Sequence, residues 1–311
     1  MELSTRQMRI LDAVARTGSC SRAAEILFMS QPGVSMQIKQ MEAMLGFRLF
    51  DRTGRRMRPT AEGRVVIARV REALAALRQA EEELAAIRGL ACGRLHLTIA
   101  STANYFAPKL IAAFLREHPG IELKLAVANR AGLVRALAEA ETDLAIMGKP
   151  PEELPLKEEA FLDNPLVVIA PPDHRLAARR RIPLAEAMRE PFIVREAGSG
   201  TRAAVERFLA ARGFTRSERI EMHSSEAIKQ AVAAGLGLGV VSAHTLEMEL
   251  ALGRLAVLDV EGFPIMRKWR LVHRADRSLP PAARAFAAFV IKHACRLVSS
   301  PLDAPAPTGL R

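Results

Sequence analysis

Cysteine is scarce in this sequence, and long apolar runs are absent from it. The three cysteines, Cys20, Cys92 and Cys295, are widely spaced and odd in number, which excludes a disulfide framework and the common metal motifs. No stretch approaches the ~18 consecutive apolar residues of a spanning helix. Charged residues interrupt the N-terminal stretch, so we expect no secretory signal. The sequence therefore predicts a cytoplasmic protein that does not enter a membrane.

Catalytic motifs are also lacking. The seven histidines show no H-x-x-x-H or H-E-x-x-H spacing, which argues against a zinc hydrolase. Gly198-Ser199-Gly200 lacks the spacing of a hydrolase nucleophile elbow. The glycines from Gly235 to Gly239 precede an expected strand and do not match a dinucleotide loop. We therefore predict that the protein is not an enzyme, has no catalytic or metal-binding residues and holds no cofactor.

Positive charge is abundant, and it is unevenly distributed. The 311 residues carry a net charge of +11. Residues 1–60 hold 10 Lys and Arg against 5 Asp and Glu, and residues 267–311 hold 9 against 2, whereas residues 61–266 hold 26 against 27. A basic block of about 60 residues has the size of a small DNA-binding module. For the basic C-terminal block we prefer a solvated helical face followed by a loose tail.

The first 60 residues carry the signals of three short helices. Ser4 and Gln7 fit a capping box, and Ser30 can cap a third helix whose first turn tolerates proline. The face opposite the apolar stripe of this third helix is small or polar, with one cation. Such a face suits a DNA major groove, where hydroxyl groups and lysine reach base edges and phosphates. It consists of Pro32, Ser35, Met36, Lys39 and Ala43.

Segment 51–60 places four arginines around Gly54. We interpret it as a hairpin-like wing that directs guanidinium groups at phosphates or at the minor groove. Helix spacing alone leaves a second interpretation equally open, namely a three-helix packing unit with a solvated basic loop. The four arginines are Arg52, Arg55, Arg56 and Arg58.

Several motifs of this block together resemble the winged helix-turn-helix of LysR-type transcriptional regulators. They are Ser21-Arg22-Ala23-Ala24-Glu25, Ser30-Gln31-Pro32-Gly33-Val34-Ser35, Leu45-Gly46, Leu49-Phe50-Asp51-Arg52 and Thr60-Ala61-Glu62-Gly63. The resemblance covers the whole block and places the helix-turn-helix core at Cys20–Lys39. We therefore predict DNA contacts from Arg22, Gln31, Pro32, Ser35, Met36, Lys39, Arg52, Arg55 and Arg56.

A longer helix is expected to follow Thr60. Its apolar residues recur at heptad spacing, which is typical of a coiled-coil seam between two chains. The alternative is an amphipathic helix that packs on the core of its own chain, but the place between two domains favours the dimer. The LysR resemblance implies pairing through this helix, which puts two recognition helices on two DNA half-sites. The predicted dimer contacts are Ile67, Val70, Leu74, Leu77 and Leu84.

The remaining part of the chain alternates apolar strands with helices, which predicts an α/β domain with buried, largely parallel strands. Such sheets bind ligands beyond the C-terminal ends of their strands. Two strand-to-helix junctions are rich in hydroxyl groups and glycine, and we expect Thr102 to start one helix and Ser199 or Thr201 the other. Each junction alone is more often a simple N-cap. Facing each other, they predict an anion site without a fixed cation.

Further segments resemble the CbbR regulators, which are LysR-type proteins that control Calvin-cycle (RuBisCO) operons. These segments are 100–108, 127–130, 143–151, 194–202, 226–232 and 259–265. The resemblance implies a two-subdomain effector domain like a periplasmic binding protein. It also implies activation of a carbon-fixation operon and an effector such as ribulose bisphosphate, phosphoenolpyruvate, ATP or NADPH. The matching cleft residues are Ser101, Thr102, Asn104, Asn129, Met147, Gly148, Ser199, Gly200 and Thr201.

The predicted layout is a DNA-binding domain at 1–60, a linker and dimerisation helix at 61–90, an effector domain at 91–298 and a disordered tail at 299–311. Within the effector domain, subdomain I would combine 91–163 with 267–298, and subdomain II would span 164–266. The predicted partners are double-stranded promoter DNA, a small anionic metabolite, further copies of the chain in a homodimer or homotetramer, and RNA polymerase. The alternative function is a LysR-type regulator of an unrelated operon.

Overall fold

The computed structural model describes residues 3–53, 56–87, 92–214, 220–299 and 302. The chain divides into two units, the first built from the first 90 residues with a short contribution from 139–141, the second from the rest. Most of the predicted tail, at 300–301 and 303–311, lies outside the described residues. None of the described helices is long and apolar enough to cross a membrane.

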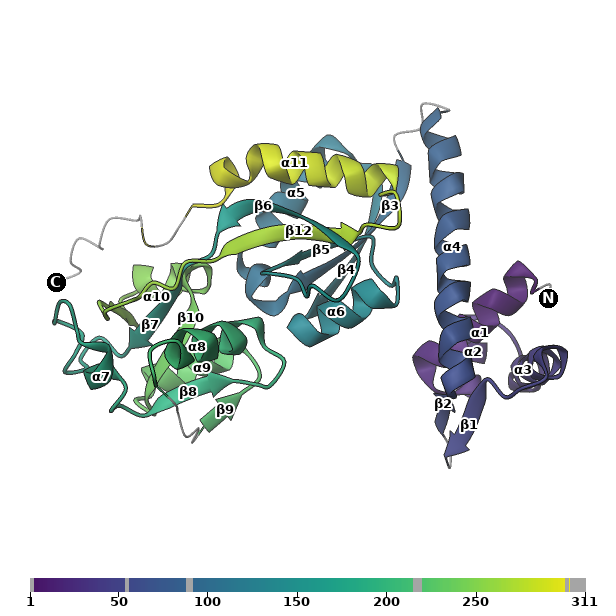
Figure 1. Cartoon of the computed structure of the whole chain (residues 1–311). Coiled ribbons are helices and arrows are strands. Elements are labelled where there is room, and N and C mark those ends of the chain that lie inside the picture. Colours follow the sequence, from purple (N-terminus) through teal and green to yellow (C-terminus); the bar gives the residue numbers. More distant parts are fainter. Residues whose placement is uncertain (1–2, 54–55, 88–91, 215–219, 300–301, 303–311) are drawn as a thin grey trace. The chain divides into compact units, whose positions relative to one another are not determined.

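The first unit contains three short helices, a two-stranded hairpin and one long helix (Figure 1). The predicted capping box between Ser4 and Gln7 begins the first helix, and Ser30 caps the third through the N–H of Gly33. The two strands pair antiparallel, which confirms the hairpin-like wing. The elements are α1 (Thr5–Thr17), α2 (Cys20–Ile26), α3 (Gln31–Leu45), β1 (Phe50–Thr53), β2 (Arg56–Pro59) and α4 (Ala61–Ile87).

The inner face of α4 packs on the helices of its own unit. Ile67 and Val70 are only 5% and 4% exposed and share a core with residues of α1, α2 and α3. The prediction that these two residues contact a second chain is therefore wrong, because the core of the same chain already covers them. Leu74 is partly buried against this core, whereas Leu77 is 48% exposed. The side chain of Leu84 lies outside the described residues.

The second unit contains two five-stranded sheets, each with its own hydrophobic cores. The first sheet has the order β4-β3-β5-β12-β6, with α5 and α11 on one face and α6 on the other (Figure 1). Its elements are β3 (Cys92–Ala100), η1 (Ser101–Tyr105), α5 (Ala107–Glu117), β4 (Gly120–Ala128), α6 (Arg130–Ala138), β5 (Leu144–Met147), β6 (Leu156–Asp163), β12 (Lys268–Arg274) and α11 (Pro281–Leu297).

The second sheet has the order β11-β7-β10-β8-β9 and is covered by α8 on one face and α9 on the other. Its elements are β7 (Leu166–Ala170), α7 (Leu184–Ala187), β8 (Phe192–Arg195), α8 (Gly200–Ala210), β9 (Ile220–Met222), α9 (Ser225–Ala233), β10 (Leu238–Ser242), η2 (Ala243–Thr245), α10 (Glu247–Ala251) and β11 (Ala256–Leu258).

Both sheets are mixed, so the expectation of largely parallel strands is wrong. In the first sheet β3 runs parallel to β4 and β5, but β12 runs antiparallel to β5 and β6. In the second sheet β8 runs parallel to β9 and β10, but β7 runs antiparallel to β10 and β11. Each antiparallel pair contains β6, β7 or β12. These strands lie next to the two segments through which the chain leaves the first sheet and later returns to it.

Two extended segments connect the two sheets, and they lie side by side. The N–H of Asn164 donates to the carbonyl of Arg267 at 2.8 Å, and Leu166 and Ile265 exchange two further backbone hydrogen bonds of 3.0 and 2.9 Å. The side chain of Asn164 is fully buried and accepts a hydrogen bond from Ser242 at 2.7 Å. These segments fix the two sheets next to each other and thereby create the cleft between them.

Candidate effector and DNA sites

A cavity of about 520 Å³ lies between the two sheets of the second unit. Ala100, Met147 and Arg195 line it, and these residues end β3, β5 and β8, which run parallel to neighbouring strands. The cavity therefore occupies the position where open α/β sheets bind ligands, beyond the C-terminal ends of strands. The paired crossing segments contribute Asp163, Met266 and Arg267 to its wall.

Eight of the nine predicted effector residues line this cavity. Ser101, Thr102, Asn129, Met147 and Gly148 come from the first sheet and its helices, whereas Ser199, Gly200 and Thr201 come from the start of α8. Asn104, in η1, is exposed and is not among the residues that line the cavity. The cavity therefore does not support its assignment to the effector site, which stays a prediction.

The two hydroxyl-rich junctions differ in structure. Ser199 caps α8, since its Oγ accepts from the N–H of Arg202, as expected for one of the two helix starts. Thr102 instead lies inside the short 3₁₀ helix η1, which has no side-chain cap. Thr102 and Thr201 are 7% and 6% exposed, and their hydroxyl groups make no hydrogen bond within the described chain. Both hydroxyl groups are thus available to a ligand.

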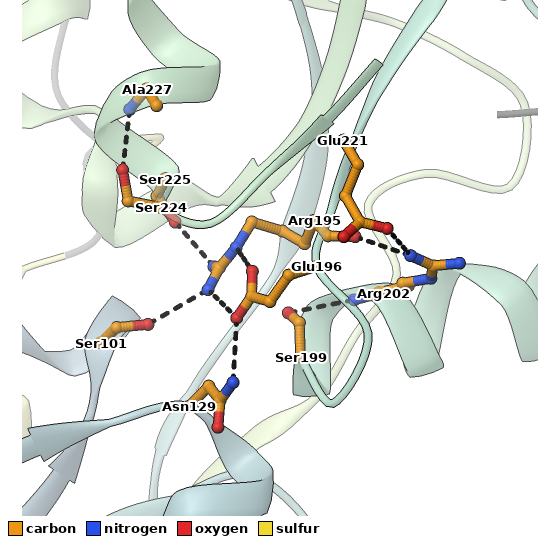
Figure 2. A network of polar contacts seen from close by, with 10 residues as sticks. All are labelled: Ser101, Asn129, Arg195, Glu196, Ser199, Arg202, Glu221, Ser224, Ser225 and Ala227. Carbon is orange, nitrogen blue, oxygen red and sulfur yellow. Dashed lines mark hydrogen bonds and ion pairs between the residues drawn. The ribbon is translucent and has the colours of Figure 1, made fainter. Parts of the chain in front are cut away.

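A buried ion pair ties the two walls of the cleft together (Figure 2). The Nε of Arg195 donates to Glu196 at 2.7 Å, and the guanidinium also donates to Ser225 and, across the cleft, to Ser101 at 3.3 Å. Asn129 donates to Glu196 from the opposite wall, also at 3.3 Å. Burial opposes ionisation of Glu196, but the Arg195 guanidinium outweighs it and holds the pKa of that carboxyl below its ordinary value.

Cations dominate the cavity wall, which corrects the expectation of an anion site without a fixed cation. Seven lining residues are basic and three are acidic. Among them Arg267 donates from Nη1 to the carbonyl of Gly200 at 2.8 Å. Burial, followed by the charges of Arg207 and Arg270, lowers the pKa of Arg267 to about 10. The basic residues are Arg130, Lys149, Arg195, Arg207, Arg267, Lys268 and Arg270.

Sequence reasoning found the hydroxyl groups of this site but missed its arginines. Arg195 ends a short apolar strand and precedes the glycine-rich junction, and this position is a usable signal in the sequence. Arg267 has no such signal, because nothing near it in the chain shows that it will face Gly148 and Gly200. It lies more than 60 residues from either glycine, so only the folded chain brings the three together.

The predicted DNA-reading face of α3 is accessible. Gln31, Pro32, Met36 and Lys39 are exposed, and Ser35 is half-buried beside them. Val34, Ile38 and Met41 fill the core on the opposite side of the helix. Arg22 and Arg56 are also exposed, whereas the side chain of Arg52 and the whole of Arg55 lie outside the described residues. The individual DNA contacts stay predictions.

Comparison with known proteins shows two family models that match this chain. Residues 5–64 match the model of the bacterial regulatory helix-turn-helix protein, lysR family, and residues 88–295 match the LysR substrate binding domain. A RuBisCO operon transcriptional regulator of Allochromatium vinosum is 50% identical over 297 residues, which cover 96% of this chain and 98% of that protein. The HTH-type transcriptional regulator CbbR of Sinorhizobium medicae (strain WSM419) is 44% identical, with 98% of each chain covered.

One solved structure bears on the cleft. The regulatory domain of CcmR from Synechocystis PCC6803, in complex with 2-PG, is 41% identical with a TM-score of 0.63 and covers 65% of this chain and 98% of that chain. Both family models and both relatives belong to transcription regulators. This agrees with the predicted fold and with the prediction that the protein is not an enzyme. The chain belongs to the LysR family of bacterial transcription regulators.

Proposed function

We propose that this regulator binds the promoter of a carbon-fixation operon and responds to a small phosphorylated carboxylate bound in its cleft. The observation that carries the effector class is the cationic cavity between the two sheets, with seven basic against three acidic side chains. Phosphate and carboxylate groups are the ligands that arginine binds best. The relatives at 50% and 44% identity support the carbon-fixation operon.

The effector that we consider first is 2-phosphoglycolate, which the Synechocystis relative binds. It carries a phosphate at one end and a carboxylate at the other, and the cavity offers guanidinium groups from two different elements, Arg195 on β8 and Arg267 before β12. The free hydroxyl groups of Thr102 and Thr201 add neutral donors. Ribulose bisphosphate, phosphoenolpyruvate, ATP and NADPH are further candidates, of which the larger nucleotides fill more of a cavity of about 520 Å³.

Binding of the effector is proposed to change how the regulator holds DNA. The chain passes between the two sheets through the crossing segments, and hydrogen bonds such as those of Arg195 with Ser101 and of Asn129 with Glu196 also join the two walls. A ligand that contacts both walls therefore favours one angle between them. A ligand shifts such an equilibrium only by its difference in affinity for the two arrangements. This proposal includes assembly into a dimer or tetramer and contact with RNA polymerase. It also includes a cytoplasmic location, because the proposed partner is DNA.

Titration calorimetry of the full chain tests the effector class. We expect 2-phosphoglycolate to bind with heat, whereas glycolate and inorganic phosphate, which each carry one of its two charged groups, should bind much more weakly. Thr102→Val keeps the side-chain shape but removes one donor, so we expect a loss of ~1–3 kcal/mol in binding free energy. Asn104→Ala is the matched control, because Asn104 lies outside the cavity. Absence of binding for every phosphorylated candidate would exclude the proposed effector class.

The operon is tested with its promoter DNA. We expect the regulator to protect a site upstream of the carbon-fixation genes of its own genome, and the effector to alter the protected region. Protection confined to an unrelated promoter would favour the alternative, a LysR-type regulator of another metabolic operon.

A further inference from the structure

Arg267 occupies a special place in the cleft, because one side chain touches both walls. Its Nη1 donates to the carbonyl of Gly200 at 2.8 Å, at the start of α8 on the second sheet. A Cβ placed on Gly148 would lie 3.0 Å from its Nη2, so the guanidinium lies directly against the backbone that follows β5 on the first sheet. The backbone of Arg267 belongs to the returning crossing segment, where its carbonyl accepts from Asn164.

The charge of Arg267 is not balanced. Four other cavity cations have carboxylate partners, since Lys149 pairs with Glu152, Arg195 with Glu196, Lys268 with Asp163 and Arg270 with Glu158. Arg267 makes no ion pair within the described part of the chain. Burial and the neighbouring Arg207 and Arg270 lower its pKa to about 10, which means that the cleft disfavours its charge. A desolvated cation of this kind is destabilising until an anion reaches it.

We propose that Arg267 is the residue that receives the anionic group of the effector and converts its binding into a change of the angle between the two sheets. This inference rests on the proposed function of the cleft and names the side chain that binds the anionic group of the effector. A guanidinium presents donors in a planar fork that fits a phosphate or carboxylate with two parallel hydrogen bonds. The N-terminus of α8, at Gly200 and Thr201, adds backbone donors next to it.

Arg195 and Arg207 are less suited to this role. Arg195 is already neutralised by Glu196 and holds Ser101 across the cleft, so it acts as a tie between the walls. Arg207 is exposed, which leaves its charge screened by water. Arg267 is half-buried, lies on a crossing segment and contacts both walls, so an anion that draws on its donors competes with the bond to Gly200. Loss or tilting of that bond changes the position of α8 relative to β5.

The test compares three variants of the full chain by calorimetry with 2-phosphoglycolate and by thermal unfolding. Arg267→Met keeps an apolar stem of similar length and removes the charge, and we expect binding to weaken by about 10- to 100-fold, the range of a charge-assisted hydrogen bond. Arg116→Met is the matched control, because this arginine is exposed on α5 and does not line the cavity, so binding should stay at the wild-type level. Gly148→Ala keeps every charge but displaces the guanidinium, so binding should weaken as well.

Thermal unfolding without ligand separates a binding role from a structural one. Removal of an unbalanced, half-buried charge should leave the melting temperature of Arg267→Met equal to or above that of the wild type, and 2-phosphoglycolate should no longer raise it. A clearly lower melting temperature would show that Arg267 is a structural tie and would overturn the inference. Equal affinity of the wild type and Arg267→Met would overturn it too, whereas absence of binding by the wild type would overturn the proposed function itself.

Discussion

At the scale of single residues, His244 is a buried histidine whose protonation the fold opposes. It lies in η2, is 5% exposed and packs against the ring of Phe106 at a centroid distance of 5.3 Å. Its Nδ1 has no hydrogen-bond partner within the described chain. Burial lowers its pKa from 6.5 to about 4, and the charge of Asp163 only partly offsets this effect.

This depressed pKa predicts acid sensitivity. Between pH 6.5 and about 4, His244 is protonated in the unfolded chain but stays neutral in the folded chain. The free energy of unfolding therefore falls as the pH is lowered through this window. The contribution is fully present above pH 6.5 and amounts to ~3 kcal/mol for a shift of this size. His244→Phe keeps the ring contact and removes the titration, so its stability should depend less on pH. Urea unfolding at pH 7 and pH 5, followed by the fluorescence of Trp269, the only tryptophan, measures the difference.

Two parallel pH profiles for the wild type and His244→Phe would show that His244 does not carry the effect. His273 shares the direction of the shift, because burial also lowers its pKa, so His273→Phe distinguishes the two histidines.

At the scale of elements, some apolar residues of α4 are buried in the core of the first unit and others are exposed to solvent. The residues near its start fill the core of the first unit, whereas Leu77, further along, is 48% exposed. Val65 is 63% exposed on the same helix, outside that core. A seam with a second copy must therefore use the exposed residues of α4, and the heptad spacing alone does not reveal this division because core packing and a seam place apolar residues at similar intervals.

Two substitutions on α4 are expected to act differently. Leu77→Asp puts a charge into the proposed seam, so we expect association to weaken strongly while the first unit stays folded. Ile67→Ala leaves a cavity in the core, so we expect a loss of ~2–5 kcal/mol in stability with little direct effect on association. Sedimentation velocity and chemical unfolding of both variants provide the measurements. Unchanged association of Leu77→Asp would place the dimer contacts elsewhere.

At the scale of the whole molecule, positive charge is concentrated in the DNA-binding block and in residues 267–311, which hold 9 basic and 2 acidic residues, rather than in the long middle of the chain. Residues 1–60 carry a net charge of +5, from 10 basic and 5 acidic residues, whereas residues 61–266 are close to neutral with 26 and 27. The positive potential of the first block attracts DNA regardless of sequence. Three of the seven cleft cations, Arg267, Lys268 and Arg270, lie outside residues 61–266, so the near-neutral sum over that range does not describe the charge of the cleft.

DNA binding should therefore weaken steeply as salt increases, through the first unit. Arg56→Ala is expected to weaken binding to specific and random DNA alike and to reduce the salt dependence by about one counterion. Ser35→Ala is expected to reduce discrimination by ~1–3 kcal/mol if Ser35 contacts a base edge. Lys292→Ala, an exposed cation of the second unit, is the control. Equal losses for the Arg56 and Ser35 variants on both DNAs would contradict the assigned face of α3.

The local features of this protein were determined by its sequence. The caps at Ser4, Ser30 and Ser199, the wing hairpin and the apolar side of α3 depend on residues a few positions apart, so periodicity and capping chemistry predict them. The hydroxyl groups of the cleft were found for a similar reason, because each lies within a few residues of the end of a strand. The LysR motifs then indicated the family.

Tertiary structure alone decided which charges meet. Whether Arg267 is balanced depends on the positions of all carboxylates around the cleft, and the residues that it contacts are far away in the sequence. The position of Asn104 outside the cavity lining could not be read from its neighbours in the chain, and the burial of Ile67 depends on three helices that precede it. Hydrophobic periodicity has the range of one helix or strand, whereas charge compensation and burial depend on contacts that only the folded chain brings together.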